Sequence, residues 1–293
     1  MTVKQLLRSA VYAATAVFAS AQDIDLSFFP GIEDYSDESI RLHGLAQLYP
    51  GRVLFDDPRL EITSASHEAA RVDDLPRDIK YIRLYRLDET QQVLSEYKEH
   101  PALIVDFRYL KSELAAINLL HAFAQKEWLS ELTLSGKVPE GLINKRTAAP
   151  FTQRDKPVVV LCNRETAGPF EAILDQLQRS GAIIAVGEPS AGRTGFYNKT
   201  GSGAWTLHGE IRPDADTSLV GVGFQPRILI ETSAEENYLS YHLYEAGTPI
   251  TRLLRDNESK SDSDEAEKTL FDNEPDRVLQ RGVDIVAALQ ILE

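Results

Sequence analysis

From residue 79 to the end, two hydrophobic patterns alternate along the chain. Apolar runs at 102–107 and 157–162 have almost no polar interruption, which is typical of strands buried on both faces of a parallel sheet. Between them, apolar residues recur at helical spacing. Strand–helix–strand repetition of this kind predicts an α/β fold with a mainly parallel sheet. The predicted strands are 79–87, 102–107, 157–162 and 182–186, and the predicted helices are 90–100, 113–129, 169–180 and 277–292.

The first part of the chain lacks this regular alternation. Residues 22–78 form a mixed N-terminal lead-in segment, in which apolar positions before a Pro-Gly pair predict a short helix at 40–48. Short strands are expected at 52–55 and 60–64, on either side of an Asp-Asp-Pro turn. The alternating core therefore begins near residue 79.

Two later regions also depart from the alternation. Residues 187–224 are rich in glycine and show no helical period, so they form either hairpins or a flexible site loop; polar–apolar alternation at 204–211 favours hairpins. Residues 256–268 are charged and lack large apolar side chains, which predicts a solvated acidic loop.

The amino terminus has the features of an export signal. Lys4 and Arg8 precede a mostly apolar run, and small residues end at Ala21, where cleavage is expected. This run is shorter than the roughly 20 residues that span a bilayer. The alternative is an amphipathic first helix of the domain. We expect residues 1–21 to be a signal peptide and the mature protein to be secreted or periplasmic, with no transmembrane segment.

Composition and charge exclude several classes of function. The 31 Lys and Arg residues are outnumbered by 45 Asp and Glu, giving a formal net charge of −14, and no basic stripe is present, which argues against nucleic-acid binding. Cys162 is the only cysteine, so neither an intramolecular disulfide nor a multi-cysteine metal site can form. The six histidines are scattered, and the His67-Glu68 pair lacks the second histidine of a zinc signature. We expect no metal and no cofactor.

The turn at 163–168 is the strongest candidate for chemistry. The buried strand at 157–162 runs into this polar turn, and Pro169 then begins a helix. A strand-to-helix turn directs backbone N–H groups and the positive end of the helix dipole at one point. That geometry suits an oxyanion or an activated nucleophile.

In order along the chain, several motifs resemble those of the C-terminal processing, or tail-specific, peptidases, which are serine peptidases with a Ser/Lys dyad. The resemblance covers residues 79–293 without a PDZ domain, and it implies a crotonase/ClpP-like spiral of strand–helix units. The matching segments are Tyr81-Ile82-Arg83, 102–108 with its Asp-Phe-Arg, 163–171 (NRETAGPFE), 187–194 (GEPSAGRT), 223–227 (GFQPR) and Asp276 to Leu279.

The departures from the family pattern fall on its catalytic residues. The serine position is Gly168, which has no nucleophile, and the lysine position, 25 residues later, is Arg193, which stays protonated. Tyr197 takes the place of a glutamine that supports the lysine. The Asn-x-Gly-Gly turn that helps to form the oxyanion hole is replaced by Tyr-Leu-Lys-Ser at 109–112. The resemblance thus implies the fold and argues against the family's activity.

Four other residues are candidates to replace the missing nucleophile or base. Ser190 and Thr166 flank the vacant position, although Thr166 is expected to hydrogen-bond the turn backbone. Cys162 ends an apolar strand and is expected to be a buried small hydrophobe. His208 could approach from the hairpin region.

The sequence leaves two interpretations of Arg193 open. Arg193 either forms a salt bridge to Glu165 or Glu188, or binds a peptide carboxylate or another small anion. Candidate binding residues at this place are Asn163, Ala167, Gly168, Gly192 and Arg193.

The favoured hypothesis is a catalytically inactive peptide- or protein-binding or scaffold module whose partner is a peptide or protein C-terminus. The alternatives are an active serine-type peptidase using a rearranged nucleophile such as Ser190, and a structural role in a homo-oligomer.

Overall fold

The computed structural model describes residues 38–55, 68–88, 90–113, 132–139, 156–254 and 275–292. Four predictions lie outside these ranges: the signal peptide 1–21, the strand at 60–64, all but the first residue of the helix 113–129, and the acidic loop 256–268. Within the described ranges, no helix is both long enough and apolar enough to cross a membrane.

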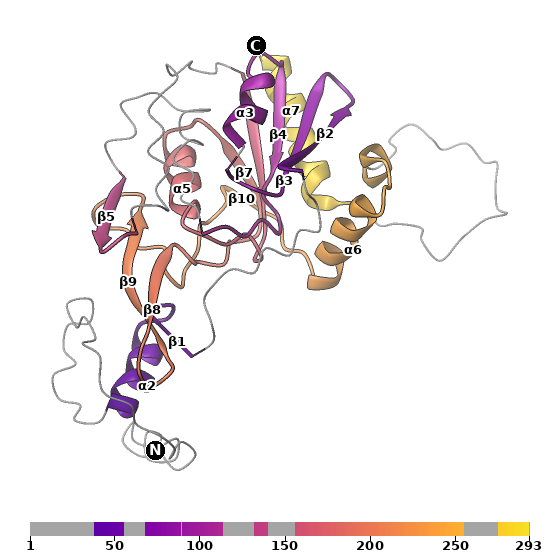
Figure 1. Ribbon diagram of the computed structural model, residues 1–293. Helices are drawn as coiled ribbons and strands as arrows, with labels where there is room; N and C mark the ends of the chain where they lie inside the picture. The colour runs from indigo at the N-terminus through magenta and orange to yellow at the C-terminus, as the bar shows by residue number, and fades with distance from the viewer. Residues whose placement is uncertain are drawn as a thin grey trace.

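A six-stranded sheet forms the body of the molecule (Figure 1). Five strands run parallel, and the edge strand β2 pairs antiparallel with β3. The two central strands are buried along their whole length, as their continuous apolar sequences predict. The spatial order is β10 (Ile228–Leu229), β7 (Ile184–Gly187), β6 (Val158–Cys162), β4 (Ala102–Asp106), β3 (Ile79–Leu84) and β2 (Ala70–Leu75).

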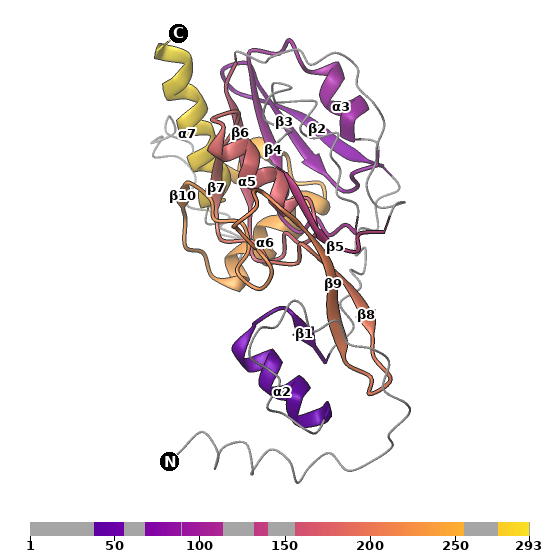
Figure 2. The same ribbon diagram turned by 90° about the vertical axis from the view of Figure 1, so that its left-hand side faces the viewer.

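Helices cover both faces of this sheet, so the body has three layers (Figures 1 and 2). On one face, α3 (Thr90–Glu96) and α5 (Glu171–Arg179) pack over the side chains of alternate strand residues. On the other face lie α6 (Ala234–Glu245), the 3₁₀ turn η5 (Ile250–Leu253) and α7 (Arg277–Leu292). The predicted α/β class with a mainly parallel sheet is confirmed.

A second, smaller sheet extends from the body. Its central strand β9 (Trp205–Arg212) pairs antiparallel with β8 (Gly195–Lys199), β1 (Val53–Leu54) and β5 (Thr133–Gly136). Figure 2 shows β8 and β9 reaching toward β1 and α2 (Glu38–Leu48), where a small third core forms. The hairpin interpretation is therefore confirmed for residues 195–212 of the region 187–224.

Element boundaries differ from the predictions where turns intervene. The predicted strand 79–87 ends at Leu84, and the predicted helix 90–100 ends at Glu96. The strands β2, β5 and β10 and the helix α6 were not predicted. A capping box marks the start of α6, since Ser233 accepts from the Glu236 N–H while the Glu236 side chain accepts from the Ser233 N–H. This Ser-x-x-Glu signal is readable in the sequence.

Candidate functional site

The predicted site lies where β6 ends and the chain turns toward α5. Neighbouring parallel strands β4 and β7 end at the same edge of the sheet, so the turn at 163–168 lies beside the segments that follow Asp106 and Gly187. The carboxyl edge of a parallel sheet is the usual place for a site in α/β proteins.

Side chains of the turn itself hold its backbone in place. Thr166 Oγ1 accepts from the Asn163 N–H at 3.0 Å and donates to the carbonyl of Phe107 at 2.9 Å. Asn163 Oδ1 accepts from the N–H groups of Tyr109 at 3.2 Å and Glu165 at 3.1 Å. Thr166 is completely buried, and its predicted role in bonding the turn backbone is confirmed.

The position of the family's serine is closed by a neighbouring segment of backbone. Ser112 N–H donates to the Ala167 carbonyl, and Ala167 N–H donates to the Leu110 carbonyl, both at 3.0 Å, which forms a short parallel bridge. Gly168 has φ +147°, and a Cβ atom built there would lie 2.0 Å from the Ser112 carbonyl oxygen. This backbone therefore has no room for a serine side chain at 168.

A buried carboxylate occupies the centre of the site. Glu171 Oε1 accepts from the N–H groups of Gly168 and Arg193, both at 2.9 Å, and Oε2 accepts from Gly192 N–H at 2.8 Å. The Ser190 hydroxyl donates to Oε2 as well. Burial raises the pKa of Glu171 above its ordinary value, while these four hydrogen bonds favour the charged form and oppose the rise. The N–H groups that could stabilise an oxyanion are thus bound to an internal carboxylate.

Ser190 links two segments of the site through its hydroxyl. Its Oγ donates to Glu171 and accepts from the Phe224 N–H at 2.7 Å. The residue is 7% exposed. Glu171 is the only titratable group in hydrogen-bond contact with this hydroxyl among the described residues.

Arg193 lies beside this carboxylate through its backbone, and its side chain is half-buried. The predicted salt-bridge partners are occupied elsewhere: Glu165 pairs with Lys111 at 2.8 Å, and Glu188 pairs with Arg164 at 2.6 Å. No ion pair joins the Arg193 guanidinium to any residue in the described ranges. The predicted salt bridge from Arg193 to Glu165 or Glu188 is therefore not present in the structure.

The remaining predicted residues form no hydrogen-bonded catalytic group within the described ranges. The Tyr197 hydroxyl donates to the Gly51 carbonyl at 2.6 Å, which ties β8 to the turn before β1. Burial raises the pKa of Tyr197, and the nearby positive charge of Arg193 opposes the rise. Cys162 is fully buried, its thiol contacts the Glu188 carbonyl at 3.3 Å, and burial raises its pKa. His208 is half-buried in β9, and no hydrogen bond joins its ring to Ser190 or Thr166 in the part of the chain that is described.

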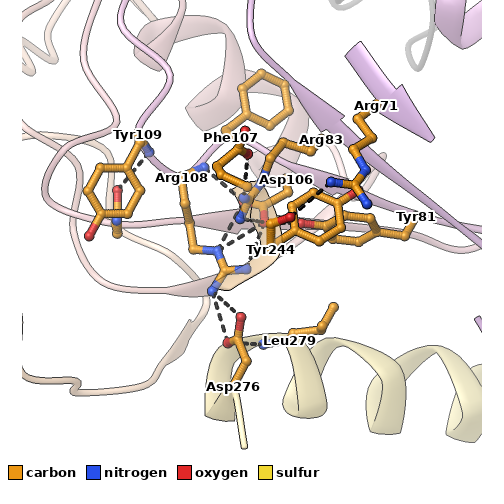
Figure 3. A network of polar contacts seen from close by, with 12 residues as sticks. Arg71, Tyr81, Arg83, Asp106, Phe107, Arg108, Tyr109, Tyr244, Asp276 and Leu279 are labelled. Atoms are coloured by element: carbon orange, nitrogen blue, oxygen red, sulfur yellow. Dashed lines mark hydrogen bonds and ion pairs between the residues drawn. The ribbon is translucent and has the colours of Figure 1, made fainter. Parts of the chain in front are cut away.

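A second cluster of polar side chains follows the carboxyl end of β4, and the sequence did not predict that its members contact one another (Figure 3). Asp106, completely buried, contacts Arg108 at 2.7 Å and Arg83 at 3.2 Å and accepts from the Tyr81 hydroxyl at 2.5 Å. Arg108 also pairs with Asp276 at 2.8 Å. Burial alone would raise the pKa of Asp106, but the two guanidinium groups lower it well below its usual range. The Asp-Phe-Arg and Asp276 motifs signalled these residues but not their contact.

Most polar groups of the site are bonded within the protein, although the buried hydroxyl of Thr194 has no hydrogen-bond partner among the described residues. Among the described residues, no cluster of three or more His, Cys, Asp or Glu could hold a metal ion. The turn hydroxyls bond backbone or carboxylate, and the site N–H groups bond Glu171.

No protein-family model and no curated protein matches the chain. Among solved structures, the photosystem II D1 C-terminal processing protease aligns at 16% identity and a TM-score of 0.43, over 57% of this chain and 49% of its own length. A Parabacteroides merdae protein assigned to the peptidases aligns at 12% identity and a TM-score of 0.46, over 70% of this chain and 79% of its own length. Mature CPAF in complex with lactacystin aligns at 12% identity and a TM-score of 0.39, over 66% of this chain and 56% of its own length. The chain thus spans about half of the first of these proteins. The aligned structures also include a protein from Bacteroides fragilis described as an S41 protease and a lipoprotein from Streptococcus agalactiae.

Proposed function

We propose that this protein is a non-catalytic counterpart of the C-terminal processing peptidases, which binds a peptide or protein segment without cleaving it. The observation that carries the proposal is the closed position at Gly168, where the Ser112 carbonyl occupies the space of a side chain. An acyl-enzyme requires a nucleophilic side chain, and this turn presents none.

Two further features support the loss of peptidase chemistry. A guanidinium stays protonated in proteins, so Arg193 cannot act as the general base that a neutral lysine would be. The N–H groups of Gly168, Gly192 and Arg193 all donate to Glu171, which leaves none of the three for an oxyanion.

Arg193 is the group best placed to bind a ligand. Its guanidinium is half-buried and has no ion-pair partner among the described residues. Because guanidinium binds carboxylates with two parallel hydrogen bonds, a peptide C-terminus is the ligand class that we propose. Arg193 lies two residues before β8, and an extended peptide could add by backbone pairing to the edge of that strand that pairs with no described strand.

Cleavage and binding can be tested on the same protein. We expect no cleavage of a fluorescently labelled disordered substrate such as casein. Cleavage that Ser190→Ala abolishes would overturn the proposal and make the protein a serine peptidase with a rearranged nucleophile. We expect a peptide library with free C-termini to bind more tightly than its amidated copy.

Arg193→Gln should remove that preference, since a hydrogen bond to a charged group contributes about 1.5–3 kcal/mol, or about tenfold or more in affinity. The matched control is Arg227→Gln, which changes an exposed arginine outside the site. Equal binding of free and amidated peptides would contradict the role of Arg193.

We also propose that the protein is exported, on the evidence of residues 1–21 alone. Amino-terminal sequencing of the protein recovered from its native location should begin at Gln22. A chain that still begins at Met1 would contradict this expectation.

A further inference from the structure

Four aromatic rings form a continuous row on the surface beside the candidate site. The Tyr109 and Tyr241 rings lie 4.5 Å apart between centroids, and Tyr238 and His242 lie 3.9 Å apart. A contact of 5.4 Å between Tyr241 and His242 joins the two pairs. We call these four residues the aromatic row. Tyr238 is 59% exposed, His242 is exposed, and Tyr109 and Tyr241 are half-buried.

The row is carried by two firmly held elements. Three of its members lie on one side of α6, because positions 238, 241 and 242 are separated by three and four residues. An adjacent side of α6 is anchored by the buried Tyr244 ring and by Asn237, whose amide donates to Glu188 at 2.6 Å. The guanidinium of buried Arg83 lies 4.9 Å from the centre of the Tyr241 ring. The rings are therefore presented by a helix fixed to the body of the protein.

Tyr109 joins the row at an energetic cost. Its φ is +63°, a left-handed conformation that is rare and strained for an aromatic residue. The Asn163 side chain holds this conformation by accepting from the Tyr109 N–H. Figure 3 shows the Tyr109 ring on the side away from the buried Asp106 cluster. A strained residue whose half-buried ring lies against other rings points to a role in binding.

The relative orientation of the rings indicates the shape of the ligand. Neighbouring ring planes are inclined to each other by 47°, 48° and 83°, so the exposed surface of the aromatic row is uneven and not flat. Proline-rich segments in the polyproline II conformation are recognised by grooves lined with aromatic side chains. No hydrogen bond engages the hydroxyls of Tyr109, Tyr238 or Tyr241 within the described ranges, and the backbone carbonyls of polyproline II have no internal donors.

The charge of the protein near the aromatic row indicates the sign of the charge expected on the ligand. Of the three glutamates in helix α6, Glu236 pairs with Arg277 and Glu245 pairs with Arg83, which also lies over the Tyr241 ring. The whole chain carries a net charge of −14. Glu235, in the first turn of this helix, is exposed. A basic peptide is attracted to such a surface, and an acidic one is repelled.

We propose that the aromatic row is a docking surface for a basic, proline-rich peptide segment in the polyproline II conformation. The inference goes beyond the proposed function, because it uses Tyr109 and α6 and not Arg193. It would hold for a peptidase as well as for a binding protein.

The test measures fluorescence anisotropy with the full-length protein and three labelled nine-residue probes. These are three repeats of Arg-Pro-Pro, three repeats of Arg-Gly-Gly and three repeats of Glu-Pro-Pro, all with amidated C-termini so that Arg193 cannot contribute by binding a carboxylate. We expect the Arg-Pro-Pro probe to bind at least about tenfold more tightly than either of the others, because it alone combines proline shape with positive charge.

Two variants locate the binding. Tyr238→Ala should weaken binding of the Arg-Pro-Pro probe about tenfold, since truncated interface tyrosines often cost that much. Tyr109→Gly should weaken it similarly without loss of thermal stability from the backbone, because glycine relieves the strain at φ +63°. Phe55→Ala, which removes a 49% exposed ring beside α2, is the matched control and should bind normally.

Three results would overturn the proposal. Equal binding of the Arg-Pro-Pro and Arg-Gly-Gly probes would show that charge alone acts, and absence of Arg-Pro-Pro binding would show that the row is not a docking surface for such peptides. Undiminished binding by both Tyr238→Ala and Tyr109→Gly would place the peptide elsewhere. Because the probes are amidated, each result is independent of the test of Arg193.

Discussion

The ion pair between Arg108 and Asp276 should contribute strongly to the stability of the fold. Arg108 Nη1 lies 2.9 Å and 2.8 Å from the two carboxylate oxygens of Asp276, and each side chain is only 3% exposed. The pair joins the end of β4 to the start of α7, across 168 positions of sequence. Asp276 also caps α7, since its Oδ1 accepts from the Leu279 N–H at 3.0 Å.

Two substitutions of Asp276 separate the charge from the cap. Asp276→Asn keeps an effective helix cap and removes the negative charge. Removal of one partner from a buried pair costs about 3–5 kcal/mol, and we expect about 3 kcal/mol here because Asp106 still pairs with Arg108. Asp276→Ala also loses the cap, which adds about 1 kcal/mol, so its expected cost is about 4 kcal/mol.

Urea unfolding followed by circular dichroism at 222 nm would measure these losses. The matched control is Asp88→Asn, which breaks an exposed pair with Arg86 at 2.7 Å and should cost at most about 1 kcal/mol. A loss below about 1 kcal/mol for Asp276→Asn would refute the reasoning, because the buried pair would then be no stronger than the exposed one. Equal losses for the two Asp276 variants would refute the contribution of the cap.

Three further predictions concern the site and its surroundings. Gly168→Ser should lower the free energy of unfolding by about 2 kcal/mol or more and create no peptidase activity, because its Cβ would meet the Ser112 carbonyl; urea titration and a casein assay would check this. Ser190→Ala should cost about 1–3 kcal/mol in the same titration, since it deprives Glu171 and a backbone N–H of a partner. Asp106 has a lowered pKa, so its stabilisation should be complete above about pH 4, the unfolded value, and decline below it; thermal melts of the protein and Asp106→Asn should converge as pH falls.

The sequence predicted the central part of the fold because burial there leaves a simple pattern. Strands β4 and β6 are covered on both faces, which produces the continuous apolar runs that identified them. Helix α7 packs one apolar side on the sheet and was predicted with its observed limits, 277–292. By contrast, β10 has only two residues, too few for any period to be detected.

The closure of the site could not be predicted from local patterns. It depends on the bridge between Lys111 and Ala167 and on the distance from position 168 to the Ser112 carbonyl. These contacts join segments more than 50 positions apart, and backbone pairing of this kind leaves no mark on side-chain composition. The position of Gly168 in a turn was readable, but the atom that fills the space beside it was not.

The residues shared with the peptidase motifs and those that differ fall into two physical groups. Asp106, Arg108 and Asp276 form buried ion pairs, and Glu171 ties the turn to the loop at 190–193. These side chains hold the fold, and each matches the motif. At Gly168 and the segment 109–112, where the family requires a nucleophile and an open oxyanion hole, the chain has backbone that closes the space. The proposal of binding without cleavage rests on this contrast, because the residues that match the motifs hold the fold and the residues that differ lie where the motifs carry their chemistry.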